Sequence, residues 1–353
     1  TVAAQASGSL ALSAAGALRT AGALRGSSIG LSAGGDLGLG HDVSSGGSLQ
    51  LHSGGAIAQT AGTLSAASLS GSSGGATSLT GANAIAALGA FDATQLSLRT
   101  LGDLSVTGPV AVAGALRLDA GGDLAIGSAL SGQSVWLQAG GDLSETGSGR
   151  ISADTLSGSV GGSTRLGAAG AAIDNRIGTL GDFSSPGGFS LTNGQSLTLS
   201  ALNGSAYTVN AGTSALYLAV LGDLLQADTT WLYDGAGTFS ASGRIGTAAN
   251  PIYVLGVRNQ TVAAIGLPPA YFYALAADGS LLGVVGESGI NVPTSAFASR
   301  AQSSSNRTIA YVDLSAANAN YRAFGLVKPG LRLPADQQPA CDADDPDAQC
   351  TQE

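Results

Sequence analysis

Residues 115–126 read ALRLDAGGDLAI, and this stretch contains the pattern that decides the fold. Apolar residues alternate with polar or small ones on both sides of a Gly-Gly-Asp turn. Alternation over a few residues is the signal of a β-strand, and Gly-Gly or Gly-Asp between strands is expected to supply the positive φ of a sharp corner. Residues 134–145, SVWLQAGGDLSE, repeat the design. The stretch therefore predicts short strands joined by tight glycine turns.

The glycine turn recurs along the chain at intervals of about 20 residues. A unit of that length holds roughly three short strands and three turns, which is one coil of a parallel β-helix. We predict an all-β chain that forms a right-handed parallel β-helix over residues 1–250, with some twelve coils ~4.8 Å apart in a rod about 60 Å long. The glycines that mark the ladder are Gly35, Gly55, Gly75, Gly102, Gly122, Gly141, Gly162, Gly181, Gly222 and Gly243.

Three copies of the turn carry an identical Gly-Gly-Asp-Leu phrase. Aspartate in a turn commonly accepts a backbone N–H bond, so we expect these side chains to hold the corners of the coils, at the same turn in each. The repeat-turn residues singled out are Gly35, Asp36, Gly122, Asp123, Gly141 and Asp142.

A longer repeat lies over the coil repeat. Residues 85–91 read IAALGAF, and residues 177–183 read IGTLGDF. The offset is about 90 residues, or four to five coils. Duplication at two scales is typical of a growing filament, and it is a poor way to build one active site.

Composition limits the classes of protein to consider. The chain has 55 Gly, 44% hydrophobic, 5% aromatic and 10% charged residues, so a core must consist of small aliphatic side chains. A net charge of −9 with scattered basic residues argues against nucleic acid as a partner. No apolar run is long enough for a transmembrane helix. Because Met is absent and no signal peptide is visible, we interpret the chain as a piece of a longer protein that keeps its natural C-terminus.

The regular series of glycine turns ends after about residue 250. Residues 251–333 are richer in aromatic residues, and we predict that they form an irregular cap over the open end of the solenoid, with a short helix near residues 316–324. Residues 334–353 form an acidic, Pro-rich tail that contains the only two cysteines, Cys341 and Cys350. An even pair in an exported chain favours a disulfide.

The coil phrases resemble a known family. Residues 116–124, LRLDAGGDL, and 135–143, VWLQAGGDL, are similar to coils of filamentous-haemagglutinin-type exoproteins, the secreted partners of two-partner secretion systems. The resemblance covers about residues 34–256. It implies export through an outer-membrane β-barrel transporter, a rod at the cell surface or in the extracellular matrix, and adhesion, aggregation or biofilm formation, with an exopolysaccharide or host glycan bound through other regions.

The tail resembles the cysteine hook of surface-retained adhesins of that kind. The resemblance implies that Cys341 and Cys350 form a disulfide that anchors the rod in the transporter, with the tail held on the periplasmic side. The acidic loop between them contains Asp342, Asp344, Asp345 and Asp347. Two other interpretations stay open: a plain terminal staple against proteolysis, and a Ca²⁺ loop, although the glycine and the late glutamate of an EF-hand are missing.

An enzyme is the principal alternative, because parallel β-helices also house polysaccharide lyases and hydrolases. Glycoside hydrolysis needs two carboxylates facing one groove, and no cluster of Asp, Lys and Arg on consecutive coils is visible. His41 and His52 lie near one another in sequence without further ligands nearby. We therefore expect a structural adhesin and no catalytic residue, metal or cofactor. A contact-dependent toxin stalk is a third possibility, but the chain ends in the hook.

Overall fold

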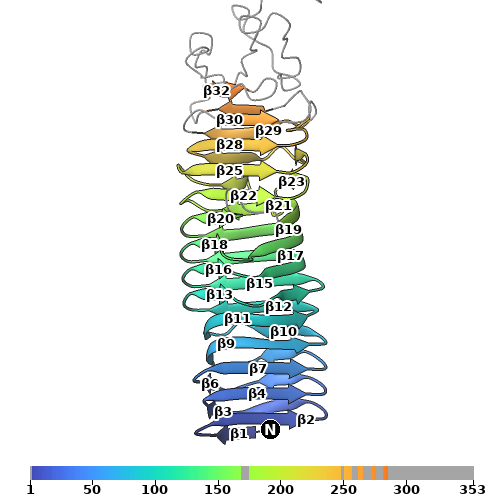
Figure 1. Cartoon of the computed structure of the whole chain (residues 1–353), viewed down its shortest axis with the longest axis vertical. Coiled ribbons are helices and arrows are strands. Elements are labelled where there is room, and N and C mark those ends of the chain that lie inside the picture. The colour runs from blue at the N-terminus through green and yellow to red at the C-terminus, as the bar shows by residue number, and fades with distance from the viewer. Residues whose placement is uncertain are drawn as a thin grey trace, which may run out of the picture.

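The computed structural model describes residues 2–167, 175–247, 250–256, 261–264, 272–275 and 281–284. The described residues form strands and no helix, and the strands stack as a long rod of about 12 coils (Figure 1). The predicted parallel β-helix with coils of about 20 residues is confirmed. Within these ranges no helix has the length and apolar character needed to cross a membrane.

The strands fall into three groups along the rod, and within one group the glycine turn lies at the same corner of every coil. Those of the first group, with the strand that follows it, are β1 (Val2–Gln5), β2 (Ser9–Ala14), β3 (Leu18–Gly26), β4 (Ser28–Ala33), β5 (Leu37–Leu39), β6 (Val43–Ser45), β7 (Ser48–Ser53), β8 (Ile57–Gln59), β9 (Leu64–Ser73), β10 (Ala76–Leu79) and β11 (Ala84–Ala93). Those of the second group, with the strand that follows it, are β12 (Gln95–Thr100), β13 (Leu104–Val106), β14 (Val110–Val112), β15 (Ala115–Ala120), β16 (Leu124–Ile126), β17 (Ala129–Ala139), β18 (Leu143–Glu145), β19 (Arg150–Val160), β20 (Thr164–Leu166) and β21 (Arg176–Ser184). Those of the third group and the end are β22 (Phe189–Asn193), β23 (Leu197–Leu199), β24 (Tyr207–Asn210), β25 (Ala215–Val220), β26 (Leu224–Gln226), β27 (Trp231–Asp234), β28 (Ala236–Ala241), β29 (Ile252–Gly256), β30 (Thr261–Ala264), β31 (Phe272–Leu275) and β32 (Leu281–Val284).

Each coil repeats one design. A long strand is followed by a glycine turn, a short strand, a second turn and another short strand. Each strand pairs in parallel with its equivalent one coil later, so Leu31 pairs with Leu51 and Leu118 with Leu137. The pair β31–β32 is antiparallel.

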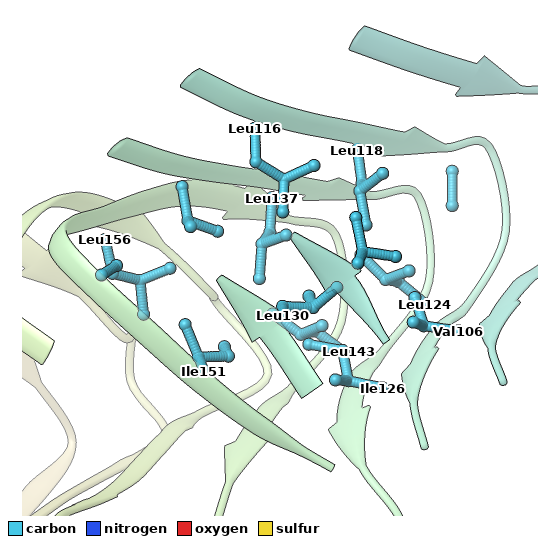
Figure 2. Close-up of a cluster of buried hydrophobic side chains, with 14 of the residues drawn as sticks. Val106, Leu116, Leu118, Leu124, Ile126, Leu130, Leu137, Leu143, Ile151 and Leu156 are labelled. Atoms are coloured by element: carbon cyan, nitrogen blue, oxygen red, sulfur yellow. The ribbon is translucent and has the colours of Figure 1, made fainter. Parts of the chain in front are cut away.

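The core is a stack of aliphatic side chains. Alternate residues of each strand point inward, as β15 shows with Leu116 and Leu118 buried between exposed or half-buried neighbours. The register places leucine on leucine in successive coils, and Figure 2 shows this packing around Leu118, Leu137 and Leu143. A fully buried side chain of this size contributes about 1.5–3 kcal/mol. A thin solenoid can therefore be stabilised almost without aromatic residues.

The turn glycines are needed for close packing between coils and not for positive φ. The prediction of positive φ is wrong for the Gly-Gly pairs of the ladder; among the ladder glycines only Gly222 has a positive φ, of 129°. A Cβ on Gly140 would instead lie nearer than 3.0 Å to the carbonyl oxygen of Gly121, one coil earlier. A Cβ on Gly141 would collide in the same way with Oδ1 of Asp123. One ladder glycine, Gly181, lies inside β21 and not in a turn.

The glycine turn changes corner twice along the rod. Within the first group long strand stacks on long strand, as β7 does on β4. The long strand β12, which opens the second group, stacks instead on the short strand β10. The long strand β22 stacks on the short strand β20 in the same way. The coil phrase is thus rotated around the rod axis from one group to the next.

A buried asparagine lies at each change of corner. Asn83 accepts the N–H of Leu64 from the coil before (2.8 Å) and donates to the carbonyl of Arg99 in the coil after (3.1 Å). Its amide also pairs reciprocally with that of Gln59. The bonds to Leu64 and Arg99 satisfy a backbone N–H and a backbone carbonyl of the neighbouring coils, and an unsatisfied buried group costs about 1–3 kcal/mol.

Asn175, at the corresponding place in the longer repeat, has the same role. It accepts the N–H of Ile151 (2.7 Å) and donates to the carbonyl of Thr192 (3.2 Å) and to Glu145 (3.0 Å). The 90-residue repeat is therefore the distance between two changes of corner.

The division at residue 250 stays a prediction. The strands β29, β30 and β31 continue the parallel stack beyond it. Most of the cap at residues 251–333 and the whole predicted helix at residues 316–324 lie outside the described residues.

A matched pair of glycines tests the packing role. Gly122 faces Oδ1 of Asp103, whereas a Cβ on Gly102 would meet nothing within 4 Å. We expect Gly122→Ala to lower the free energy of unfolding by about 1–3 kcal/mol through overpacking. Gly102→Ala, in the same position of the turn, should leave it unchanged or raise it by up to about 1 kcal/mol. Urea unfolding measures both; equal effects would contradict the close-packing explanation.

Candidate functional site

Five turn aspartates each join their coil to the next. In every case Oδ1 accepts a backbone N–H from the residue that follows the glycine turn one coil later, and the turn glycine there leaves room for the carboxylate. We call each such contact an Asp–Gly clasp. The bonds run from Ala56 to Asp36 (2.9 Å), from Asp123 to Asp103 (2.8 Å), from Asp142 to Asp123 (2.8 Å), from Ser163 to Asp142 (2.6 Å) and from Arg244 to Asp223 (2.7 Å).

The repeat-turn residues lie on two corners of the rod. Gly122 and Gly141 share one corner, where the N–H of Gly141 donates to the carbonyl of Gly122 (3.0 Å). Gly35 lies on another corner, where backbone N–H···O=C bonds connect Gly35, Gly55, Gly75 and Thr94 in successive coils. Thr94 directly precedes the long strand β12 and is not part of a glycine turn. The expectation of one common corner was wrong, because the phase of the coil changes between the first and second groups.

The clasps at Asp142 and Asp223 lower the pKa of those two carboxyl groups. The pKa of Asp142 lies below its ordinary value of 3.8, chiefly because the backbone N–H of Ser163 bonds to the charged form, with help from the Ser163 hydroxyl. The backbone N–H of Arg244 has the same leading effect on the pKa of Asp223. These groups are ionised at neutral pH. A general acid for glycoside cleavage needs a raised pKa, so their environment suits a structural acceptor.

The two histidines do not form a common site. His41 contacts the backbone oxygen of Thr20 through Nδ1 (3.2 Å), and His52 contacts the hydroxyl of Ser72 (3.1 Å). In the part of the chain that the structure describes, no three His, Cys, Asp or Glu residues are grouped so as to hold a metal ion.

The predicted hook lies outside the described residues. This applies to Cys341 and Cys350 and to the acidic loop of Asp342, Asp344, Asp345 and Asp347. The disulfide and its anchoring role stay predictions.

An aromatic row that the sequence reasoning missed lies on the outside of the third group. Tyr207 of β24, Trp231 and Tyr233 of β27 and Tyr253 of β29 are half-buried, while the residues between them point into the core. The rings of Tyr207 and Tyr233 have centroids 5.5 Å apart, and those of Trp231 and Tyr253 are 5.2 Å apart. Desolvation raises the pKa of Tyr253. The signal was present as alternating aromatic residues in YTV, WLY and IYV.

Comparison with known protein families, with curated proteins and with solved structures finds no match for this chain.

The lowered carboxyl pKa values predict an acid dependence of stability. A carboxyl whose pKa is lower in the folded than in the unfolded chain stabilises the fold above the unfolded pKa, and this contribution is lost as the pH falls through the folded pKa. We expect Asp142→Asn to lower the melting temperature at neutral pH, because it removes the charge that the Ser163 N–H stabilises. The difference from wild type should shrink on acidification from about pH 5 to about pH 2.

The matched control is Asp154→Asn, at an exposed aspartate on β19. It should change the melting temperature little at any pH. A pH-independent difference between wild type and Asp142→Asn would contradict the role of the charged clasp.

Proposed function

We propose that this chain is the stalk of a bacterial surface adhesin and not an enzyme. The rod is exported through the outer-membrane β-barrel transporter of a two-partner system. Its C-terminal hook retains it at the cell surface or in the matrix around the cell, where it supports adhesion, aggregation or biofilm formation. The resemblance of the coil phrases at residues 116–124 and 135–143 to filamentous-haemagglutinin-type exoproteins supports this direction.

One observation carries the proposal: every coil is joined to the next by the same kind of contact along the rod. Parallel strand pairing continues from β1 to β31, and Asp–Gly clasps hold the turn in each of the three groups. In a solenoid each coil contacts only its neighbours, so length is added without changing the rest of the molecule. This is the property that a spacer needs.

The enzyme alternative requires a different use of carboxylates. A hydrolase or lyase would have acidic side chains converging on one groove with different pKa values. Here Asp36, Asp123 and Asp142 accept backbone N–H bonds at two separate corners. The resolved carboxyl pKa shifts among the described residues are all downward. The arrangement favours a scaffold.

Removal of one whole coil tests the stalk. Deletion of residues 103–122 joins Gly102 to Asp123, which restores the turn phrase and the phase of the coil. We expect cells that display this variant of the full-length protein to export, retain and use it in attachment as well as wild type. A half-coil deletion of residues 103–112 is the control, and it should abolish folding and display because a shift of phase exposes core residues. Loss of attachment by the well-folded one-coil deletion would contradict the proposal.

The anchoring role has a separate test. Replacement of both cysteines, Cys341→Ser with Cys350→Ser, in the full-length protein should release the rod into the medium, because the closed loop can no longer hold the tail in the transporter. Immunoblotting of cell and medium fractions measures the distribution. If the double variant stays on the cell as firmly as wild type, the hook interpretation is wrong.

A further inference from the structure

The aromatic row differs from the outward positions that precede it on the same line of strands. Outward positions on the same line of strands, one group earlier, are filled by residues such as Gln138, Ser157 and Ser159. The one aromatic residue there, Trp136, has the guanidinium of Arg117 over its ring, 3.6 Å from the centroid. Along this line of strands, the change to successive Tyr and Trp side chains therefore begins at β24 and continues through β27 and β29.

The core does not explain these rings. Val209, Leu232 and Val254 are the inward residues of the three strands, and they are 0–1% exposed. The aromatic residues alternate with them and stand on the opposite face of the sheet. An outward ring at a strand position where Ser or Thr suffices earlier in the rod adds flat apolar surface toward the solvent side.

The rings follow the rod axis at the spacing of the coils. Register pairs Tyr207 with Trp231, and the next pair along, Leu232 with Val254, places Trp231 beside Tyr253. The backbone positions of Tyr207, Trp231 and Tyr253 are thus one coil apart, ~4.8 Å along the axis. Tyr233 lies in the same strand as Trp231, and its ring packs on that of Tyr207. The same register continues from Tyr253 to Tyr273 of β31.

We propose that Tyr207, Trp231, Tyr233 and Tyr253 form a binding face for a neutral, extended, β-linked polysaccharide that lies along the rod. The C–H groups on the flat side of a hexose are attracted to the negative face of an aromatic ring. An extended β-1,4-linked chain advances per sugar by nearly the distance between coils. Successive sugars can therefore meet successive rings.

Polar groups beside the rings suit hydroxyl-bearing sugars. The half-buried Asn210 lies next to Tyr233 in the strand register. Thr230, also half-buried, directly precedes Trp231 and is held by Asp228. Tyr and Trp themselves carry a hydroxyl or N–H at the ring edge.

Charge selects the class of glycan. The chain has a net charge of −9, and the acidic Asp228 lies beside the row. An anionic polysaccharide would be repelled, as would a second copy of the chain at low salt. A neutral glycan avoids both costs. This inference goes beyond the proposed stalk function, which needs no ligand and is tested by the coil deletion.

The two tryptophans allow a direct measurement. Trp136→Phe leaves Trp231 as the only tryptophan of the chain, and Trp231→Phe leaves Trp136. Titration of each variant with cellohexaose should change the fluorescence of the first and not of the second. Maltohexaose, whose α-linkages curl the chain, is the control for geometry and should have a much weaker effect.

Calorimetric titration of alanine variants locates the face. Trp231→Ala and Tyr253→Ala should each weaken cellohexaose binding by about tenfold or more, as expected for central aromatic anchors. Tyr217→Ala is the matched control, because Tyr217 is 38% exposed on the neighbouring strand β25 of the same coil; its affinity should equal that of wild type. Thermal melting confirms that each variant is folded.

Three outcomes would overturn the proposal: no fluorescence change with cellohexaose at millimolar concentration, equal binding by wild type and folded Trp231→Ala, or equal binding of cellohexaose and maltohexaose. Concentration-dependent association of the chain that Trp231→Ala abolishes, without glycan binding, would assign the face to a second copy instead. Sedimentation velocity distinguishes that case.

Discussion

The close approach of consecutive coils at the glycine turn is the constraint on which the rest of the structure depends. Strands in neighbouring coils are held about 4.8 Å apart by their hydrogen bonds. At turn glycines such as Gly122, Gly140 and Gly141 this spacing leaves no room for a Cβ. Glycine removes that atom, and the aspartate of the coil before fills the space and accepts the next free N–H. One short phrase thus solves both the steric and the hydrogen-bonding problem of a corner, which explains why it recurs.

The same constraint explains the longer repeat. A clasp needs a matching turn in the next coil. The turn can therefore change corner only where a side chain bonds to the backbone N–H and C=O groups that lose their partners in the neighbouring coils. Asn83 and Asn175 do this by bonding to the coils on both sides. The rod therefore consists of groups of like coils that are rotated relative to one another. The position of the long strand on the outside of the rod therefore differs from one group to the next, while the aliphatic core continues without interruption.

The packing between coils places few restrictions on the residues that point outward. Inward residues and turn glycines are restricted by packing, whereas an outward residue between two coils needs only to be compatible with its neighbours. Small residues such as Ser, Ala and Gly occupy many of these positions, and they suit a passive spacer. The aromatic row on β24, β27 and β29 departs from that pattern, and it is there that the rod differs from a simple scaffold.

Local pattern in the sequence determined the strands, the length of the coil and the aliphatic core, because alternation and glycine spacing depend on residues near one another in the chain. It also identified Asp36, Asp123 and Asp142 as turn residues. Only the tertiary structure decided why the glycines are needed, which aspartates share a corner, and that Tyr207, Trp231 and Tyr253 line up. Those features arise between residues about one coil apart, and which residues meet depends on the phase of the coil. Asn83 and Asn175 change that phase through long-range hydrogen bonds that no local pattern reveals.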